Sequence, residues 1–343
     1  MDWTLYIYKT IFLIIIFLVT LVVAMYSTYG ERKVAAFMQD RRGPNRAGLF
    51  GLLQPIADGV KMFMKEEIIP LTANRVLFIL GPSIAMTTAM LTGVVIPWGG
   101  TLTIGGREFS MQIADLNIGI LYVFAMVSIG VYGIMIGGWA SNNKYALLGS
   151  IRAASQMISY EIAMGMTIVA LILSTGTLSL HEIVQQQHGM HWNIFYQPLG
   201  FLIFIICAFA ETNRAPFDLP ECETELIGGY HTEYSSMKLG FYLFAEYINM
   251  FISSAVIATL YFGGYNMPFI DQLGLSGNMV ALLGTLFLFL KIFGLIFLFM
   301  WIRWTLPRFR YDQLMNLGWK KLMPMAIFNI LATGAYYYFT EFI

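Results

Sequence analysis

The amino-acid sequence predicts an all-α membrane protein, a bundle of about eight transmembrane helices with one further amphipathic helix at the membrane interface. The chain of 343 residues is 58% hydrophobic and only 12% charged, whereas soluble domains carry about 25% charged residues. The apolar residues also form long continuous segments, without the alternation that is typical of membrane strands. We therefore expect a single integral membrane domain over residues 1–343.

Eight segments have, or nearly have, the length of about 20 apolar residues that a helix needs to cross the hydrocarbon core. The predicted spans are 5–29, 76–96, 117–138, 156–176, 194–211, 239–262, 279–302 and 322–340. The fifth is the shortest and runs directly into a group of acidic residues. The N-terminal segment has no basic stretch before it and no cleavage site after it, so we interpret it as an uncleaved first span.

The basic residues predict how the spans are oriented. Four predicted loops hold 17 of the 20 Lys and Arg residues of the chain. These loops are 30–75, 139–155, 212–238 and 303–321. Of the other three basic residues, Lys9 and Arg107 belong to the opposite side and Lys291 lies within a span. The positive-inside rule then places the four loops in the cytoplasm and both termini on the outer, periplasmic side.

A cluster of carboxylates follows the fifth span. Residues 183–210 contain no Asp, Glu, Lys or Arg, and then five carboxylates surround one local cation, Arg214. The five are Glu211, Asp218, Glu221, Glu223 and Glu225. Carboxylates at a membrane edge are costly and often form proton relays or ion paths. We interpret the cluster as a candidate proton path; the alternative is a solvated acidic loop in which each residue titrates separately.

Three more ionisable residues lie within predicted spans. Glu161, in the fourth span, is about half a turn around the helix from Arg152, and we expect it at a packed helix interface. Glu246 begins a polar stripe on one face of the sixth span. Lys291 is central in the seventh span, and both glutamates are candidate partners for it. For Glu161 and Lys291, a structural ion pair is the alternative to proton transfer.

The first cytoplasmic loop combines basic residues with an amphipathic segment. Residues 49–65 place apolar side chains at helical spacing opposite Asp58, Lys61 and Lys65, which predicts a helix lying at the membrane interface. Arg32 and Arg41 lie in basic stretches before it. These stretches either anchor the loop to lipid phosphates or form a docking surface for an acidic partner or a polar ligand headgroup.

The sequence contains no motif for a redox cofactor. Two isolated cysteines, Cys207 and Cys222, cannot ligate an iron–sulfur cluster, and no Cys/His spacing fits a metal site. There is no phosphate-binding loop and no nucleotide-binding pattern. We therefore expect that this chain binds no metal and no cofactor by itself, and that it performs no redox chemistry alone.

A set of motifs spans nearly the whole chain in the order of a known family. They are residues 31–33, 42–45, 54–61, 65–66, 138–145, Arg152, Gln156, 159–161, 211–229, 233–235, 245–247 and 307–315. In this order they resemble the H subunit of NADH:quinone oxidoreductase, the bacterial counterpart of subunit 1 of mitochondrial NADH dehydrogenase in respiratory complex I. Cys222 and Thr224 stand where relatives often have Ala or Ser, and this leaves the carboxylates in place.

The resemblance implies a membrane subunit of a proton-pumping translocase in the cell inner (plasma) membrane. It implies that the chain forms part of the quinone chamber near Arg32, Arg41 and Asp58, and that it couples quinone reduction to proton translocation. The implied proton path comprises Glu161, Glu211, Asp218, Glu221, Glu223, Glu225 and Glu246, to which we add Lys291. Quinone is the substrate, while NADH, FMN and iron–sulfur clusters belong to partner subunits.

The implied partners are the peripheral quinone-module subunits, the neighbouring membrane-arm subunits and membrane lipid, with no nucleic acid. One alternative is the homologous membrane subunit of a membrane-bound hydrogenase or a related respiratory complex. Another is a proton-coupled secondary transporter or a passive membrane anchor. The residues leave open the electron donor, the number of protons, and ubiquinone or menaquinone as the substrate.

Overall fold

The computed structural model describes residues 3–219, 226–268 and 276–342. Within these ranges the regular secondary structure is helical apart from one short hairpin of two strands, so the predicted all-α class is confirmed. The elements are α1 (Trp3–Met38), η1 (Leu49–Gly51), α2 (Gln54–Met64), α3 (Arg75–Thr92), β1 (Thr101–Ile104), β2 (Arg107–Ser110), α4 (Gly119–Ala140), α5 (Lys144–Thr175), α6 (Leu180–Gln186), α7 (Asn193–Tyr196), α8 (Pro198–Glu211), η2 (Gly229–His231), α10 (Ser236–Tyr261), α11 (Gly277–Thr305), α12 (Tyr311–Asn316), the π-helical η4 (Leu317–Leu322) and α13 (Met323–Phe342).

Six helices in the described ranges, α1, α3, α4, α5, α10 and α11, are long and apolar enough to cross a membrane. The chain is thus a multi-pass membrane protein, as predicted. The fifth predicted span, 194–211, contains α8, whose 14 residues cover only about 21 Å at 1.5 Å per residue, less than the ~30 Å of hydrocarbon. The eighth, 322–340, folds as α13. For α8 and α13, a full crossing of the membrane stays a prediction.

Two helices begin or end well outside the predicted spans. α1 runs to Met38, so Glu31 and Arg32, which we expected in a loop, lie on its last turns. The residues after Gly30 are good helix formers and contain no proline until Pro44, so nothing in the sequence stops the helix at the membrane surface. α5 begins at Lys144, where the side chain of Asn143 caps it by accepting a hydrogen bond from the Tyr145 amide at 2.9 Å.

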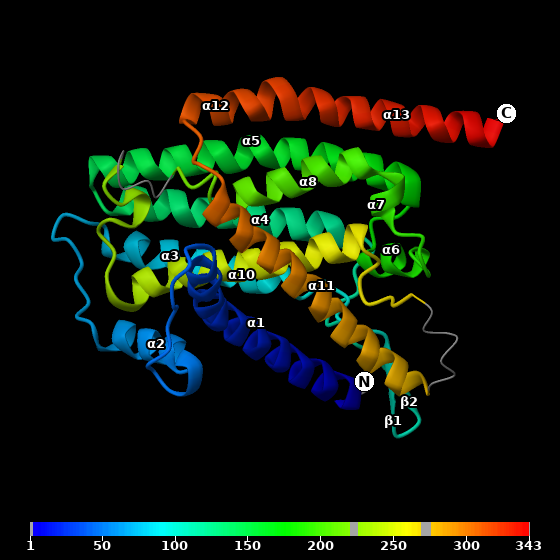
Figure 1. Cartoon of the computed structure of the whole chain (residues 1–343), viewed down its shortest axis with the longest axis horizontal. Helices are drawn as coiled ribbons and strands as arrows, with labels where there is room; N and C mark the ends of the chain where they lie inside the picture. Colours follow the sequence, from blue (N-terminus) through cyan, green and yellow to red (C-terminus); the bar gives the residue numbers. More distant parts are fainter. Residues whose placement is uncertain (1–2, 220–225, 269–275, 343) are drawn as a thin grey trace.

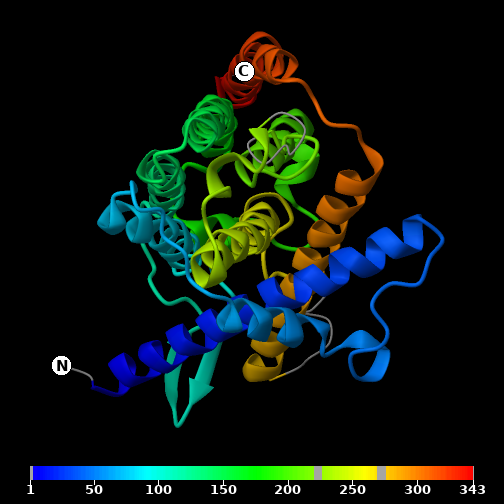
Figure 2. The ribbon, with the colours of Figure 1, turned by 90° about the vertical axis from the view of Figure 1, so that its left-hand side faces the viewer.

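The long helices form a bundle in which α10 is the central element. α3, α4, α5, α8 and α10 run side by side along the long axis, α13 covers α5 on one side, and α1 and α11 cross obliquely on the other (Figures 1 and 2). In α10, 67% of the most apolar 18-residue stretch is buried, whereas the corresponding share is 28% in α1 and 33% in α11. α3 and α4 approach closely at glycines: a Cβ atom on Gly81 would lie 2.8 Å from the Cα atom of Gly137.

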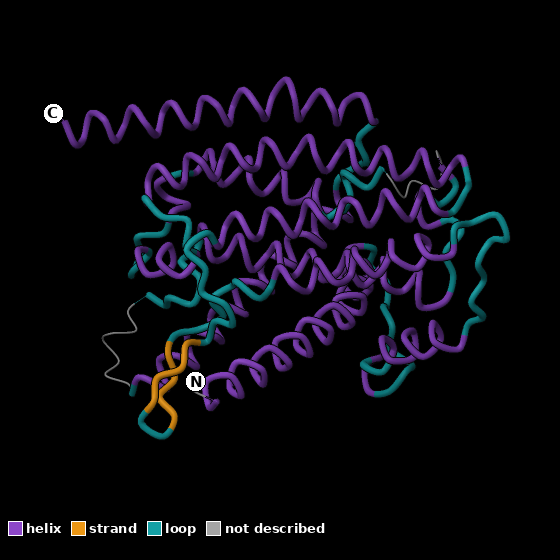
Figure 3. The backbone as a smooth tube through the Cα atoms, turned by 180° about the vertical axis from the view of Figure 1, so that it is seen from behind, coloured by secondary structure: helices purple, strands orange, loops and turns teal. Residues whose placement is uncertain are grey.

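The helix predicted over 49–65 is present as η1 and α2, and its position at the membrane interface stays a prediction. The predicted elements do not include the antiparallel hairpin of β1 and β2 (Figure 3). Its turn, Gly105-Gly106, has two positive φ angles, as a tight hairpin turn requires. The hairpin meets the start of α11 through Asn278, whose side chain bonds the backbone of Thr103.

A cavity and a buried ionic network as the candidate functional site

Helices α1, α2, α10 and the end of α11 enclose a cavity of about 350 Å³. This volume lies in the range of about 300–1,000 Å³ that is typical of small-molecule sites. Apolar side chains form most of its wall, namely Met25, Pro55, Met62, Leu243, Phe244 and Trp304. Polar groups also reach the cavity from three helices, namely Glu31, Arg32, Asp58, Lys61 and Tyr247. An apolar ligand with a polar headgroup fits this lining.

Two of the three residues predicted to bind quinone meet at this cavity. Arg32 of α1 and Asp58 of α2 form an ion pair at 2.7 Å, with side chains that are 49% and 27% exposed. A pair this exposed adds little stability, so its charges are available to a ligand. Arg41 is elsewhere: it is exposed in the loop after α1, and its side chain bonds to Gln39 at 2.7 Å.

Glu31 is the buried centre of an ionic network on the wall of the cavity. Its carboxylate accepts hydrogen bonds from the Tyr247 hydroxyl at 2.7 Å and from Arg214 at 3.2 Å, and it pairs with Arg303 at 2.6 Å. Sequence reasoning missed Glu31, Tyr247 and Arg303 as site residues. The available signal was an acidic residue, Glu31, at the membrane end of a span and directly before a basic pair.

Among the described carboxylates, Arg214 forms an ion pair with Glu31 of α1 and not with Glu211 or Asp218 of its own cluster. It is buried, stacks on the Tyr247 ring at 4.0 Å and pairs with Glu31, 183 residues away in the chain. Burial lowers the pKa of Arg214, but Tyr247, Glu31 and Glu246 raise it by more, so the pKa is raised overall. The guanidinium therefore stays charged although two of its nitrogens, Nε and Nη2, are buried with no hydrogen-bond partner among the described residues.

The predicted acidic cluster is divided in the structure. Asp218 is buried and pairs with Arg308, which follows α11, at 2.9 Å. Glu211 lies at the end of α8 and faces a different cavity. Glu221, Glu223 and Glu225 lie outside the described residues, so the interpretation of all five as one coupled set stays a prediction.

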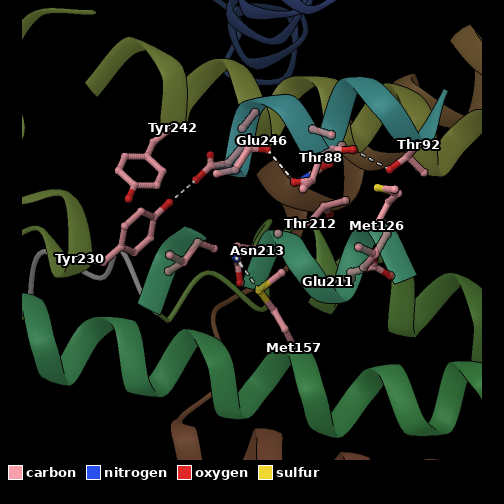
Figure 4. A pocket seen from close by; sticks show the side chains of 17 residues that line it. Thr88, Thr92, Met126, Met157, Glu211, Thr212, Asn213, Tyr230, Tyr242 and Glu246 are labelled. Carbon is pink, nitrogen blue, oxygen red and sulfur yellow. Dashed lines mark hydrogen bonds between the residues drawn. The ribbon is translucent and has the colours of Figure 1, made fainter. Parts of the chain in front are cut away.

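Glu211 and Glu246 line one small cavity of about 30 Å³ between α3, α4, α5 and α10 (Figure 4). Glu246 accepts a hydrogen bond from the Tyr230 hydroxyl at 3.0 Å. A second cavity of about 30 Å³ also touches Glu211 and reaches Ser253. Each has room for about one water molecule. The structure thus brings together two carboxylates that the sequence places 35 residues apart.

Glu161 extends this group onto α5. Its carboxylate is half-buried and accepts a short hydrogen bond from the Ser128 hydroxyl of α4, which confirms the prediction of a packed helix interface. Glu161 also interacts electrostatically with Glu211. Three of the predicted carboxylates, Glu161, Glu211 and Glu246, therefore lie in one region of the bundle core.

Lys291 is not part of this region. Its ammonium group donates to the backbone carbonyls of Phe262, Gly264 and Asn266. Neither Glu161 nor Glu246, the two candidate partners from the sequence, contacts it, and no ion pair joins Lys291 to any other described residue. A backbone turn has taken the place of the expected carboxylate.

Comparison with known proteins identifies the family. Residues 10–334 match the family model described as NADH dehydrogenase. The chain is 72% identical over 327 residues to an H subunit of the NADH-quinone oxidoreductase of Cytophaga hutchinsonii, covering 95% of this chain and 96% of the relative. It is 63% identical over 338 residues to the H subunit of Flavobacterium psychrophilum, covering 97% and 98%. The chain belongs to the family of NADH-quinone oxidoreductase H subunits.

More distant members show the same full-length match. The H subunit of Thermomicrobium roseum is 47% identical over 343 residues, covering 97% of both chains. This chain is therefore a membrane subunit of NADH-quinone oxidoreductase, and its partners are the other subunits of that complex. NADH, FMN and the iron–sulfur clusters belong to those subunits. Among the residues that the structure describes, no group of three or more His, Cys, Asp or Glu side chains could hold a metal ion.

Proposed function

We propose that the 350 Å³ cavity is the membrane-side part of the quinone chamber and that the carboxylates behind it begin the proton path. The cavity adjoins α2, whose exposed face carries Ile56, Val60 and Phe63. An amphipathic helix with such a face lies in the membrane interface. A lipid-soluble quinone can thus reach the cavity from the bilayer without crossing water.

The lining of the cavity suits the chemistry of a quinone headgroup. Quinone carbonyl oxygens accept hydrogen bonds, and they gain negative charge when electrons arrive from the partner subunits. Arg32 and Lys61 supply donors and positive charge on the wall of the cavity. Charge-assisted hydrogen bonds of this kind are about twice as strong as neutral ones. The apolar wall holds the isoprenoid chain.

The position of Arg214 is the observation that carries the proposal. On one side Arg214 pairs with Glu31, which lines the quinone cavity. On the other side it interacts electrostatically with Glu246, which lines the small cavity next to Glu211. Arg214 is thus a buried positive charge that pairs with one carboxylate and acts electrostatically on a second, and the two carboxylates belong to different cavities.

This arrangement links redox chemistry to proton affinity. Negative charge on a reduced quinone competes with Glu31 for the nearby arginines and changes the field at Arg214. Since these side chains are buried and water screens them poorly, the change in electrostatic potential at Arg214 also acts on Glu246 and Glu211. The proton affinity of the carboxylate group then depends on the redox state of the quinone. Coupled groups of this kind take up and release protons as a set.

The proposed path runs from Glu246 to Glu211, with single water molecules in the small cavities as carriers, and continues to Glu161 on α5. Asp218, with Arg308, extends the path toward the cytoplasm. Three further carboxylates of the same loop complete this extension in the proposal, although they lie outside the described residues; they are Glu221, Glu223 and Glu225. Lys291 is left out of the path, because backbone carbonyls bind its donors.

We further propose that the basic end of the bundle faces the cytoplasm and that both termini face the periplasm. Both termini lie at one end of the bundle, and α2 lies at the other (Figure 1). The positive-inside rule assigns the end with more Lys and Arg to the cytoplasm. Single cysteines at Asn142 and Gly106 should react with an impermeant maleimide from opposite sides of the membrane. Labelling of both from the same side would refute the orientation.

The path is tested with Glu246→Gln and Glu211→Gln in the assembled complex, reconstituted in vesicles. Glutamine keeps the size of the side chain and removes its titration. We expect slower quinone reduction and slower proton pumping, while NADH oxidation by ferricyanide in the partner subunits is unchanged. Glu108→Gln, in the exposed hairpin, is the matched control. Assembled variants that pump protons at the wild-type rate would contradict the proposal.

A further inference from the structure

Lys291 of α11 lies in a site built from backbone carbonyls. Its Nζ atom is 2.7 Å from the carbonyl oxygen of Phe262, 2.7 Å from that of Gly264 and 3.2 Å from that of Asn266. All three carbonyls belong to the turn that follows the last residue of α10. The ring of Phe287 lies 4.2 Å from the same nitrogen.

The geometry favours a charged ammonium group. Three acceptors surround Nζ, and only the protonated form has three N–H donors and no lone pair. The Phe287 ring and the ring of Trp192, 5.0 Å away, present π faces that attract a cation. The C-terminal end of α10 adds the negative pole of a helix dipole. Each of these features is one that would favour a free monovalent cation.

The turn itself is built to present its carbonyls. Gly263 and Gly264 both have positive φ angles, 72° and 54°, which place successive peptide units in a left-handed bend that favours glycine. A Cβ atom on Gly264 would come within 2.7 Å of the Val184 side chain, so the close contact with α6 also excludes a larger residue there.

Hydrogen bonds from α6 and the residue after it hold the turn from its other side. Asn266 donates its side-chain amide to the carbonyl of Val184 at 2.5 Å. The side-chain oxygen of Gln187 accepts a hydrogen bond from the backbone amide of Gly263 at 3.0 Å. The side-chain nitrogen of Gln187 donates to the backbone carbonyl of Thr259, also at 3.0 Å. The turn is thus a fixed platform to which Lys291 joins α11.

We propose that Lys291 is a tethered cation: it fills a monovalent-cation site formed by the carbonyls of Phe262, Gly264 and Asn266, and so fastens α11 to the end of α10. α11 crosses the bundle obliquely (Figure 2), and only 33% of its most apolar 18-residue stretch is buried, so this contact adds to limited packing. The proposal also says that an emptied site binds a small free cation, with ammonium as the closest match to the lost group.

The first test uses Lys291→Ala in the assembled complex. We expect a lower melting temperature than that of the wild type, and a saturable recovery as ammonium chloride is added. Tetramethylammonium chloride at equal ionic strength should give no recovery, because it has no N–H donor and is too large. The wild type and the exposed control Lys144→Ala should respond equally to both salts. Unchanged stability of Lys291→Ala, or equal recovery with both salts, would overturn the proposal.

The second test separates a fastening role from proton transfer and does not depend on the alanine variant folding. Lys291→Arg keeps the charge and the donors, but arginine is not deprotonated in proteins. A fastening role predicts normal assembly and a normal ratio of protons pumped to electrons transferred. Lys291→Met, with a similar chain and no charge, should assemble poorly and should not respond to ammonium. A loss of pumping in assembled Lys291→Arg, or assembly of Lys291→Met at the wild-type level, would refute the proposal.

Discussion

Substitution of Glu31 by glutamine is the sharpest test of the ionic network at the quinone cavity. In the structure, one buried carboxylate serves two arginines, Arg214 at 3.2 Å and Arg303 at 2.6 Å. The Arg214 side chain is 4% exposed, so water cannot replace the lost charge. Removing one partner of a buried pair costs about 3–5 kcal/mol, because it leaves an uncompensated charge.

The expected effect on activity follows from that cost. If the native arrangement of the arginines becomes less favourable by about 3 kcal/mol, its population relative to disrupted arrangements falls by about 100-fold. We therefore expect Glu31→Gln to reduce NADH:quinone reductase activity in the assembled complex, by at most about two orders of magnitude. NADH:ferricyanide activity, which resides in the partner subunits, should be unchanged.

A double variant distinguishes charge imbalance from simple loss of shape. Replacing both partners of a buried pair is often far less costly than replacing one. Glu31→Gln combined with Arg303→Gln should therefore be more active than Glu31→Gln alone, although the charge of Arg214 stays unpaired. Activity of Glu31→Gln within about twofold of the wild type, or an additive loss in the double variant, would refute the reasoning.

Three further predictions concern other contacts. Arg32→Gln should leave the melting temperature nearly unchanged, since the exposed pair with Asp58 contributes at most about 1 kcal/mol, but should raise the KM for quinone about tenfold through the loss of a charge-assisted hydrogen bond. Gly81→Ala should destabilise the complex by about 1–3 kcal/mol in thermal unfolding, because its Cβ atom meets the backbone of α4. Gln156→Leu should lower the melting temperature by leaving the carbonyls of Ala210 and Phe217, around the loop after α8, without their donor. Wild-type melting temperatures would contradict the Gly81 and Gln156 predictions, and an unchanged KM would contradict the Arg32 prediction.

The sequence predicts the long helices well because their signal is local. A run of about 20 apolar residues has few folds open to it in a membrane other than a helix. The helical spacing of Ile56, Val60 and Phe63 likewise predicts α2 as an amphipathic helix. Element ends are less well predicted. Nothing in the sequence near Glu31 stops α1, and the polar residues after Asn143 begin α5 before the apolar span.

The sequence also shows which residue types are costly in a membrane and therefore candidates for function. Glu161, Glu211 and Glu246 stand out in this way. The structure gathers Glu211 and Glu246 around small cavities, and it places Glu161 against Ser128 at a helix interface. Proximity in the sequence was a poor guide to pairing, however. Arg214 lies among the acidic residues of its own loop, yet its partner is Glu31 of α1. An ion pair forms where helix packing brings two side chains together, whatever the number of residues between them in the sequence.

By itself, the sequence determined the membrane class, most of the spans and the charged residues that need a partner. The tertiary structure decided which residues each of them contacts. Asp218 meets Arg308, 90 residues away, and Lys291 meets no described carboxylate but three backbone carbonyls. Every residue has a carbonyl, so composition and periodicity cannot reveal which ones converge. Their direction depends on backbone angles at residues such as Gly263 and Gly264, and these angles are settled only when the helices on either side have packed.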